Sequence, residues 1–119
     1  MRFTVKRVYE DPDSGDGFRV LVDRLWPRGL SKDRAHVDRW LKDVAPSTEL
    51  RRWFDHRASR FAEFSARYTS ELDGNESVEE LRQLARKHPT VTLLYGAKDT
   101  EINHAVVLAR FLAGLSPTT

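Results

Sequence analysis

Short segments of β-branched and aromatic residues predict three β-strands. Residues 2–9 alternate only partly between polar and apolar side chains, which indicates an edge strand or a bulge. Residues 18–23 carry apolar side chains on both faces, and residues 90–95 form the clearest strand pattern in the chain. A strand that is apolar on both faces must be covered on both sides, so the pattern favours a sheet enclosed by helices.

Apolar residues spaced three or four positions apart predict two helices soon after the second strand. Ser31 is the expected N-cap of the first, and Ser47, which follows Pro46, is the expected N-cap of the second. The apolar positions of the first helix are Val37, Trp40, Leu41 and Val44. Those of the second are Leu50, Trp53 and Phe54.

The remaining helices follow from the same spacing together with end signals. A longer helix after His56 carries Phe61, Phe64, Tyr68 and Leu72 on one side. Ser77 and Glu80 match a capping box for the next helix, which Pro89 ends. A largely apolar helix is expected over residues 101–115, and residues 116–119 are expected to form a frayed tail.

The order of these elements predicts one domain over residues 1–119. Strand, strand, several helices, strand and helix is typical of an α/β layered fold with a small, mainly parallel β-sheet flanked by helices. The stretch between the second and third strands contains helical crossovers, which parallel strands require. A length of 119 residues also fits a single core better than two.

Composition removes several classes of function. The chain has no cysteine, which excludes disulfides, thiolate nucleophiles and iron–sulfur clusters. Its four histidines form no metal-binding pair, so neither a metal nor a cofactor is expected. No apolar run is long enough for a signal peptide or a bilayer span, so we expect a cytoplasmic protein without membrane contact. The oligomeric state stays open.

The charge is unevenly distributed, although the formal net charge is only +2. Residues 24–60 contain ten basic and five acidic side chains, a local charge of +5. Arginine supplies 15 of the 20 cations, and its planar guanidinium binds phosphates and carboxylates bidentately. The alternative is a coding bias toward arginine with solvated helix faces, so only arginines that gather around a concave site would indicate an anion.

Polar residues follow the second and third predicted strands at the point where each strand ends. They are Asp23, Arg24, Arg28, Lys98, Asp99, Asn103 and His104. In open α/β sheets, ligands bind beyond the carboxyl ends of the strands, so these side chains are expected to converge on a phosphate or carboxylate. The glycine pattern matches neither a P-loop nor a dinucleotide fingerprint.

Each of these residues has a proposed role and a structural alternative. The residues expected to hold the anion are Arg24, Arg28 and Lys98, with Asn103 orienting it. The candidate catalytic acid–base groups are Asp23, Asp99 and His104. Alternatively, Asp23 pairs with a neighbouring arginine, Asp99 or Thr100 caps the last helix, and His104 is a hydrogen-bonded core residue.

Trp26 is the tryptophan whose position suggests a ligand contact. It lies in a predicted loop beside Pro27 and Arg28, so we expect it to form a wall of the ligand pocket. Trp40 and Trp53 occur at helical spacing, which favours packing in the core over stacking on bases.

Four linked motifs resemble the DUF488 family, in its YeaO-like branch. They are residues 23–29 (DRLWPRG), 40–47 (WLKDVAPS), 49–54 (ELRRWF) and 92–99 (TLLYGAKD), the last followed by Asn103-His104-Ala105. The resemblance implies a small bacterial cytoplasmic α/β domain of unknown function, with no assigned activity or catalytic residues. Its polar motif positions correspond to Asp23, Arg24, Arg28, Lys42, Ser47, Arg51, Lys98, Asn103 and His104.

The sequence leaves three functions open and does not decide whether the protein is an enzyme. The first is a site for a small anionic ligand at the carboxyl edge of the sheet. The second is nucleic-acid binding through Arg34, Arg39, Arg51, Arg52, Arg57 and Arg60, which requires these arginines to share one face. The third is a protein-interaction module that uses exposed aromatic residues around Trp53 and Phe54.

Overall fold

Four parallel strands form the sheet of the computed structural model, which describes residues 2–114. The strands are β1 (Arg2–Arg7), β2 (Phe18–Leu21), β3 (Arg39–Trp40) and β4 (Thr90–Tyr95), in the spatial order β1-β4-β2-β3. The register pairs Phe3 and Phe18 with Val91, so β4 lies between β1 and β2. This confirms the α/β class, the parallel sheet and the edge position of the first strand.

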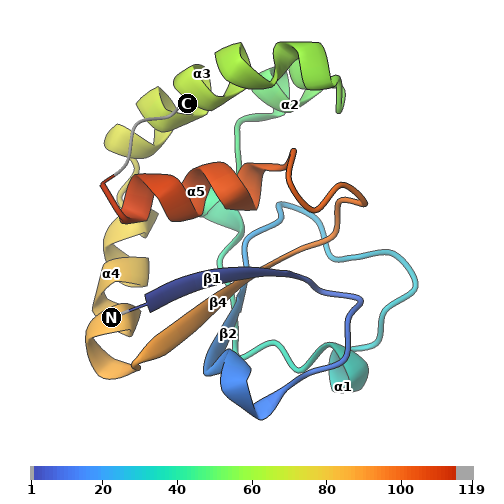
Figure 1. Cartoon of the computed structure of the whole chain (residues 1–119), viewed down its shortest axis with the longest axis vertical. Coiled ribbons are helices and arrows are strands. Elements are labelled where there is room, and N and C mark those ends of the chain that lie inside the picture. The colour runs from blue at the N-terminus through green and yellow to red at the C-terminus, as the bar shows by residue number, and fades with distance from the viewer. Residues whose placement is uncertain (1, 115–119) are drawn as a thin grey trace.

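Three of the five described helices lie together over one face of the sheet (Figure 1). They are α3 (Phe61–Asp73), α4 (Ser77–Lys87) and α5 (His104–Leu112). The shorter helices are α1 (Lys32–Ala35) and α2 (Thr48–Phe54), and single 3-10 turns occur at Ser14–Asp16, Lys42–Val44 and Ala58–Arg60. In Figure 1, α2 lies beside α3 and α1 lies at the opposite end of the molecule.

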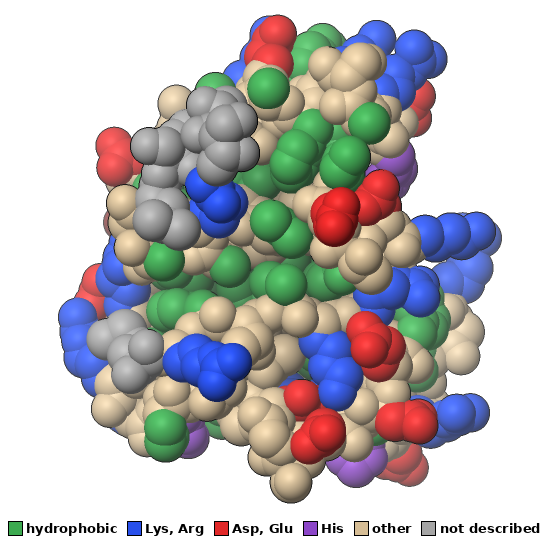
Figure 2. Space-filling view, viewed as in Figure 1, with side chains coloured by type: hydrophobic (Ala, Val, Ile, Leu, Met, Phe, Trp, Pro, Cys, Tyr) green, Lys and Arg blue, Asp and Glu red, His purple; other side chains and the backbone are tan. Residues whose placement is uncertain are grey.

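The larger core lies between the sheet and helices α3, α4 and α5. Val20 and Leu93 of the strands are fully buried with Phe64 and Tyr68 of α3 and Leu108 of α5. Figure 2 shows a band of hydrophobic side chains between α5 and β1, with charged side chains on both sides of the band. Burial of this apolar face is the main stabilising contribution to such a layered fold.

The opposite face of the sheet has a smaller core, covered by α1 and by loops. Leu21 and Leu94 pack with Ala35, and the rings of Trp26 and Trp40 lie against this cluster. The residue before each leucine in the sequence belongs to the core on the other face. The two indoles meet edge to face with their centroids 5.5 Å apart. The alternation of the strands therefore places one apolar set on each side of the sheet.

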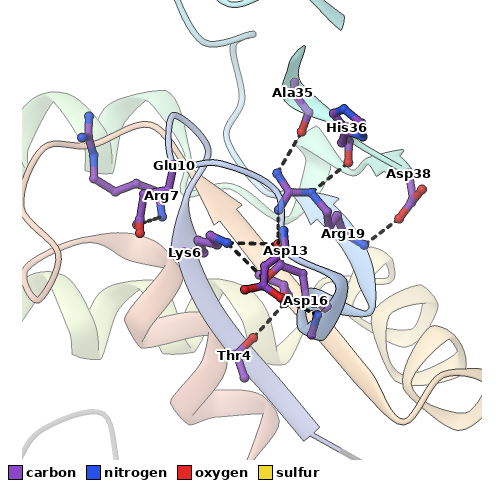
Figure 3. A network of polar contacts seen from close by, with 12 residues as sticks. Thr4, Lys6, Arg7, Glu10, Asp13, Asp16, Arg19, Ala35, His36 and Asp38 are labelled. Carbon is purple, nitrogen blue, oxygen red and sulfur yellow. Dashed lines mark hydrogen bonds and ion pairs between the residues drawn. The ribbon is translucent and has the colours of Figure 1, made fainter. Parts of the chain in front are cut away.

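A buried ion-pair network fastens the loop before β2 to this same face (Figure 3). The carboxylate of Asp16 accepts hydrogen bonds from Lys6 Nζ at 3.1 Å and from the guanidinium of Arg19. Arg19 also donates to the carbonyl oxygens of Ala35 and His36, each at 2.9 Å. The network joins β1, β2 and the end of α1, and it satisfies an arginine that is only 5% exposed.

The long helix predicted from Ser31 to Val44 is wrong. Ser31 does cap a helix, but α1 ends at Ala35, because His36 adopts a left-handed conformation with φ of +48°. The chain then forms β3, which pairs with β2 in parallel. The helical spacing of the apolar residues was coincidental: Val37 and Trp40 lie against one core, and Leu41 and Val44 belong to the other.

Two helix starts also differ from prediction. The Ser77–Glu80 capping box does not form, since α4 has no side-chain cap, and Asn75 Oδ1 instead accepts a hydrogen bond from Ser77 N. Helix α5 begins at His104 rather than at residue 101, because Asn103 is its N-cap. Ser47 caps α2 as expected, with Leu50 N donating to its hydroxyl at 3.2 Å. Leu115 and the predicted tail lie outside the described residues.

Candidate functional site

A cavity of about 850 Å³ lies beyond the carboxyl ends of β2 and β4. Its wall combines three segments: the loop that follows β2, the chain around α2 and the loop between β4 and α5, with one residue each from α3 and α5. The lining residues are Asp23, Arg24, Leu25, Arg28, Ala45, Pro46, Thr48, Arg51, Arg52, Phe54, Asp55, His56, Phe64, Gly96, Ala97, Asn103 and His104. We refer to it as the larger cavity.

Asp23 links the ends of the two central strands. Its Oδ2 accepts a hydrogen bond from Gly96 N at 2.9 Å. A Cβ atom at position 96 would lie 2.9 Å from that same oxygen, so any larger residue would have to displace the carboxylate. The carboxylate therefore fixes the loop after β2 to the loop after β4 at the base of the cavity.

His104 contacts the same region from the first turn of α5. Its Nε2 lies 3.1 Å from the carbonyl oxygen of Val22 and 3.2 Å from Asp23 Oδ1. A carbonyl oxygen can only accept, so His104 Nε2 donates this hydrogen bond. Asp23 Oδ1 itself is buried and has no donor in hydrogen-bonding geometry. The ring edge of His104 faces Tyr68, with the centroids 6.3 Å apart.

Asn103 and Asp99 shape the loop that leads into α5. Asn103 is 2% exposed; its Oδ1 accepts from Val106 N and its Nδ2 donates to the Asp99 carbonyl oxygen. The Asp99 carboxylate accepts from the backbone N–H groups of Ile102 and Glu101, and these two bonds lower its pKa. Both side chains therefore have structural partners, but the helix cap considered for Asp99 or Thr100 is wrong, because Asn103 caps α5 and Asp99 bonds within the loop before it.

Four arginines surround the larger cavity. Nη2 of Arg24 is half-buried and lies 3.3 Å from the carbonyl oxygen of Ala45, while its Nε is buried without a partner. The side chains of Arg28, Arg51 and Arg52 are exposed, and within residues 2–114 none of them forms an ion pair. Within the described residues no carboxylate binds these guanidinium groups, so they have N–H donors available for a ligand.

The described wall contains only two carboxylates, Asp23 and Asp55, beside these four arginines. Asp55 lies 3.5 Å from Arg57, in an exposed ion pair. The wall therefore carries a net positive charge, and a cavity of this kind concentrates anions.

Sequence reasoning did not place Asp55 and His56 at the site. Both adopt left-handed conformations, with φ of +48° and +54°, where the chain leaves the end of α2. Aspartate and histidine tolerate this conformation better than most residues. The Asp-His pair directly after a helix could therefore have indicated a left-handed turn here. Arg51 and Arg52 were not predicted at the strand-end site: both were considered for nucleic-acid binding, and Arg51 also as a polar motif position of the family, although they line the larger cavity with Arg24 and Arg28.

The predicted residue set is divided between two neighbouring cavities. Lys98 and Asp99 line a smaller cavity of about 420 Å³, together with Ile102. The two cavities share His56, Gly96 and Ala97. Lys98 is therefore next to the larger cavity and does not line it, whereas Asp23, Arg24, Arg28, Asn103 and His104 do.

Trp26 lies apart from both cavities. Its Nε1 donates to the carbonyl oxygen of Leu30 at 2.7 Å, and its ring packs against Trp40 on the opposite face of the sheet. The expected pocket wall is formed instead by its neighbour Leu25. Trp26 fixes the conformation of the loop that carries Arg24 and Arg28.

The arginines considered for nucleic-acid binding do not gather on one face. Arg34 belongs to α1, and Arg51 belongs to α2 at the other end of the molecule (Figure 1). Arg39 pairs with Glu80 at 2.6 Å, and Arg60 donates to the carbonyl oxygen of Trp53. The six arginines are therefore spread from one end of the molecule to the other, and Arg39 and Arg60 are engaged with internal partners.

The aromatic surface expected around α2 is largely covered. Phe54 is buried and stacks on Phe64, with centroids 4.2 Å apart. Trp53 is half-buried, with the guanidinium groups of Arg60 and Arg67 at 5.3 and 4.6 Å from its ring centroid. These cation–π contacts shield the indole from solvent.

The described residues lack both a metal-binding cluster and a membrane-spanning helix. No group of three or more histidine, cysteine, aspartate or glutamate side chains is placed to hold a metal ion. None of the helices described has the length and apolar character needed to cross a membrane.

The sequence of the chain matches a known protein family. Residues 2–116 match the family described as the inactive DUF488-N3 subclade, which confirms the resemblance seen in the motifs. An uncharacterised protein of Mycobacterium tuberculosis is 49% identical over 113 residues, which cover 95% of each chain. The uncharacterised protein YeaO of Escherichia coli is 46% identical over 116 residues, which cover 97% of this chain and all of YeaO. No solved structure matches the chain.

Proposed function

We propose that this chain, which belongs to the DUF488 family in the subclade described as inactive, binds a small anion in the larger cavity and does not convert it chemically. The anion carries a phosphate or a carboxylate group. The observation that supports this proposal is the gathering of Arg24, Arg28, Arg51 and Arg52 around one cavity. Guanidinium groups without internal carboxylate partners are the side chains best suited to bind such anions bidentately.

The chemistry of the wall favours binding over catalysis. Thr48 supplies the one side-chain hydroxyl among the described lining residues, and the chain contains no cysteine. His104 donates through Nε2 to the Val22 carbonyl, and within the described residues no hydroxyl group hydrogen-bonds to its ring. A site without an activated nucleophile fits the family's description as inactive.

Titration calorimetry with inorganic phosphate and with acetate, at constant ionic strength, tests the proposal. We expect at least one anion to bind, and Arg28→Ala to weaken binding about 10- to 100-fold, as the loss of a charge-assisted hydrogen bond of about 1.5–3 kcal/mol predicts. Arg34→Ala is the matched control, since Arg34 is an exposed arginine on α1 that makes no ion pair and lines neither cavity. Equal weakening in both variants would show only a loss of overall charge.

Thermal unfolding supplies an independent measurement. An anion present at 100 times its dissociation constant stabilises the folded state by about 2.7 kcal/mol. The expected result is a higher Tm in the unmodified protein and in Arg34→Ala, with a smaller shift in Arg28→Ala. No shift with any phosphate or carboxylate would reject anion binding.

A further inference from the structure

We infer that the anion is one end of an organic ligand with an apolar body, and that this body lies against Leu25 and the apolar part of the wall. The inference rests on the proposed anion site and adds the class of ligand that the site selects. A cavity of about 850 Å³ is much larger than one inorganic phosphate requires. Cavities of about 300–1,000 Å³ typically hold drug-sized organic molecules.

Leu25 is the first observation that points to an apolar body. It is 67% exposed, the most exposed large hydrophobic side chain in the described chain, and it borders the larger cavity between Arg24 and Arg28. A single exposed leucine normally requires no explanation. This one is placed where a ligand held by the two neighbouring guanidinium groups would cover it.

The loop that carries Leu25 is held in place on both sides. Trp26 donates to the Leu30 carbonyl at 2.7 Å, and the Tyr9 hydroxyl donates to the Arg28 carbonyl at 2.9 Å. The exposure of Leu25 is therefore a fixed feature of the folded loop. A ligand that covers this side chain removes apolar surface from water without first ordering the loop.

The rest of the wall offers apolar surface and few neutral hydrogen-bonding groups. Its apolar members besides Leu25 are Ala45, Pro46, Phe54, Phe64 and Ala97. The Asn103 amide is already bonded to Val106 and Asp99, which leaves Thr48 and the imidazoles of His56 and His104 as the other neutral polar side chains of the wall. With the guanidinium groups on the anionic end, a polyhydroxylated body would replace few of its hydrogen bonds to water, so the wall favours an aromatic or aliphatic body.

Phenyl phosphate and methyl phosphate test the inference, because they carry the same charged group on bodies of different size. We expect the unmodified protein to bind phenyl phosphate at least tenfold more tightly. Leu25→Ser should reduce the affinity for phenyl phosphate about three- to tenfold and leave that for methyl phosphate unchanged. Leu25→Met, which keeps an apolar side chain of similar size, should retain the preference.

The outcomes separate this inference from the proposed function. If Arg28→Ala weakens both probes by the same factor while Leu25→Ser weakens only phenyl phosphate, both proposals are supported. Equal binding of the two probes to the unmodified protein, or equal weakening of both by Leu25→Ser, would overturn the apolar body and leave anion binding standing. If neither probe binds, the apolar body is overturned, and the acetate titration then decides whether the anion site stands. Because Leu25 is exposed, its replacement leaves the folded core intact.

Discussion

The carboxylate of Glu71 in α3 accepts two hydrogen bonds from Ser47, one from the backbone N at 2.9 Å and one from the hydroxyl at 2.6 Å. The same hydroxyl accepts from Leu50 N and so caps α2. The two residues directly before Ser47 present carbonyl oxygens to the guanidinium of Arg24. One half-buried contact between α3 and the N-cap of α2 therefore also positions an arginine of the larger cavity.

Glu71→Gln should lower both stability and anion affinity. The amide can keep only one of the two bonds from Ser47, so we expect a loss of about 1–3 kcal/mol in the free energy of unfolding, measured by urea denaturation. Anion affinity should fall a few-fold, because the carbonyl partners of Arg24 are no longer held as firmly. Glu63→Gln on the same helix is the control, since Glu63 forms only an exposed pair with Arg67. Equal losses in the two variants would contradict this role for Glu71.

Gly17→Ala should be strongly destabilising. Gly17 has φ of +65°, and a Cβ atom there would lie 2.2 Å from the carbonyl oxygen of Thr90 at the start of β4. Strain of this kind costs about 1–3 kcal/mol before the steric clash is added. Gly74→Ala is the matched comparison, because Gly74 has φ of −103° and open space around its Cα. Thermal and urea unfolding of the two variants should rank them clearly, and a similar Tm for both would refute the argument.

Asp16→Asn should remove part of the acid sensitivity of the fold. Burial raises the pKa of Asp16, but hydrogen bonds from the Asp13 backbone, Lys6 and Arg19 together outweigh it, so the net shift is downward. The folded pKa thus lies below the unfolded value of about 3.9, and the ionised carboxylate stabilises the fold above about pH 4. This contribution is lost as the pH falls from there through the folded pKa.

The measurement is the free energy of unfolding between pH 2 and pH 7. Breaking a buried ion pair costs about 3–5 kcal/mol, so Asp16→Asn should be less stable at pH 7 and converge with the unmodified protein at the acid end. Asp33→Asn, at an exposed position in α1, should leave the pH profile unchanged. Parallel profiles for Asp16→Asn and the unmodified protein would rule out this linkage.

Gly96→Ala should act through Asp23. The added Cβ would lie 2.9 Å from Asp23 Oδ2 and displace the carboxylate that accepts from Gly96 N. We expect a loss of about 1–3 kcal/mol in stability and weaker anion binding, since the loops on two sides of the cavity are no longer joined. In a double-mutant cycle with Asp23→Asn the two losses should be clearly non-additive. Additive losses would show that Gly96 acts independently of Asp23.

The parts of the fold that the sequence predicted depend on local signals. The β4 strand has apolar residues on both faces, and the Ser47 cap needs only a hydroxyl before a helix, so both were predicted correctly. The helix expected after Ser31 failed because β3 depends on pairing with β2, which lies 18 or more residues earlier in the chain. A two-residue strand has no periodicity to recognise.

The sequence likewise predicted some residues of the candidate site and missed others. The rule that ligands bind beyond the carboxyl ends of parallel strands placed Asp23, Arg24 and His104 together, and all three line the larger cavity. Arg51 and Arg52 join them only because α2 packs beside α3, a tertiary contact that no local pattern encodes. Trp26 was predicted to line the pocket because it lies in a loop beside Pro27 and Arg28, yet its indole packs on Trp40.

The wall of the larger cavity is assembled from three separate stretches of chain, the loop after β2, the region around α2 and the loop before α5. None of them holds the four arginines alone, and they meet only when the sheet and α3 are both in place. Repulsion among these guanidinium groups is a cost that the folded chain carries and the unfolded chain does not. An anion that relieves this repulsion therefore stabilises the folded chain. Its binding should be lost at the same denaturant concentration at which the core unfolds.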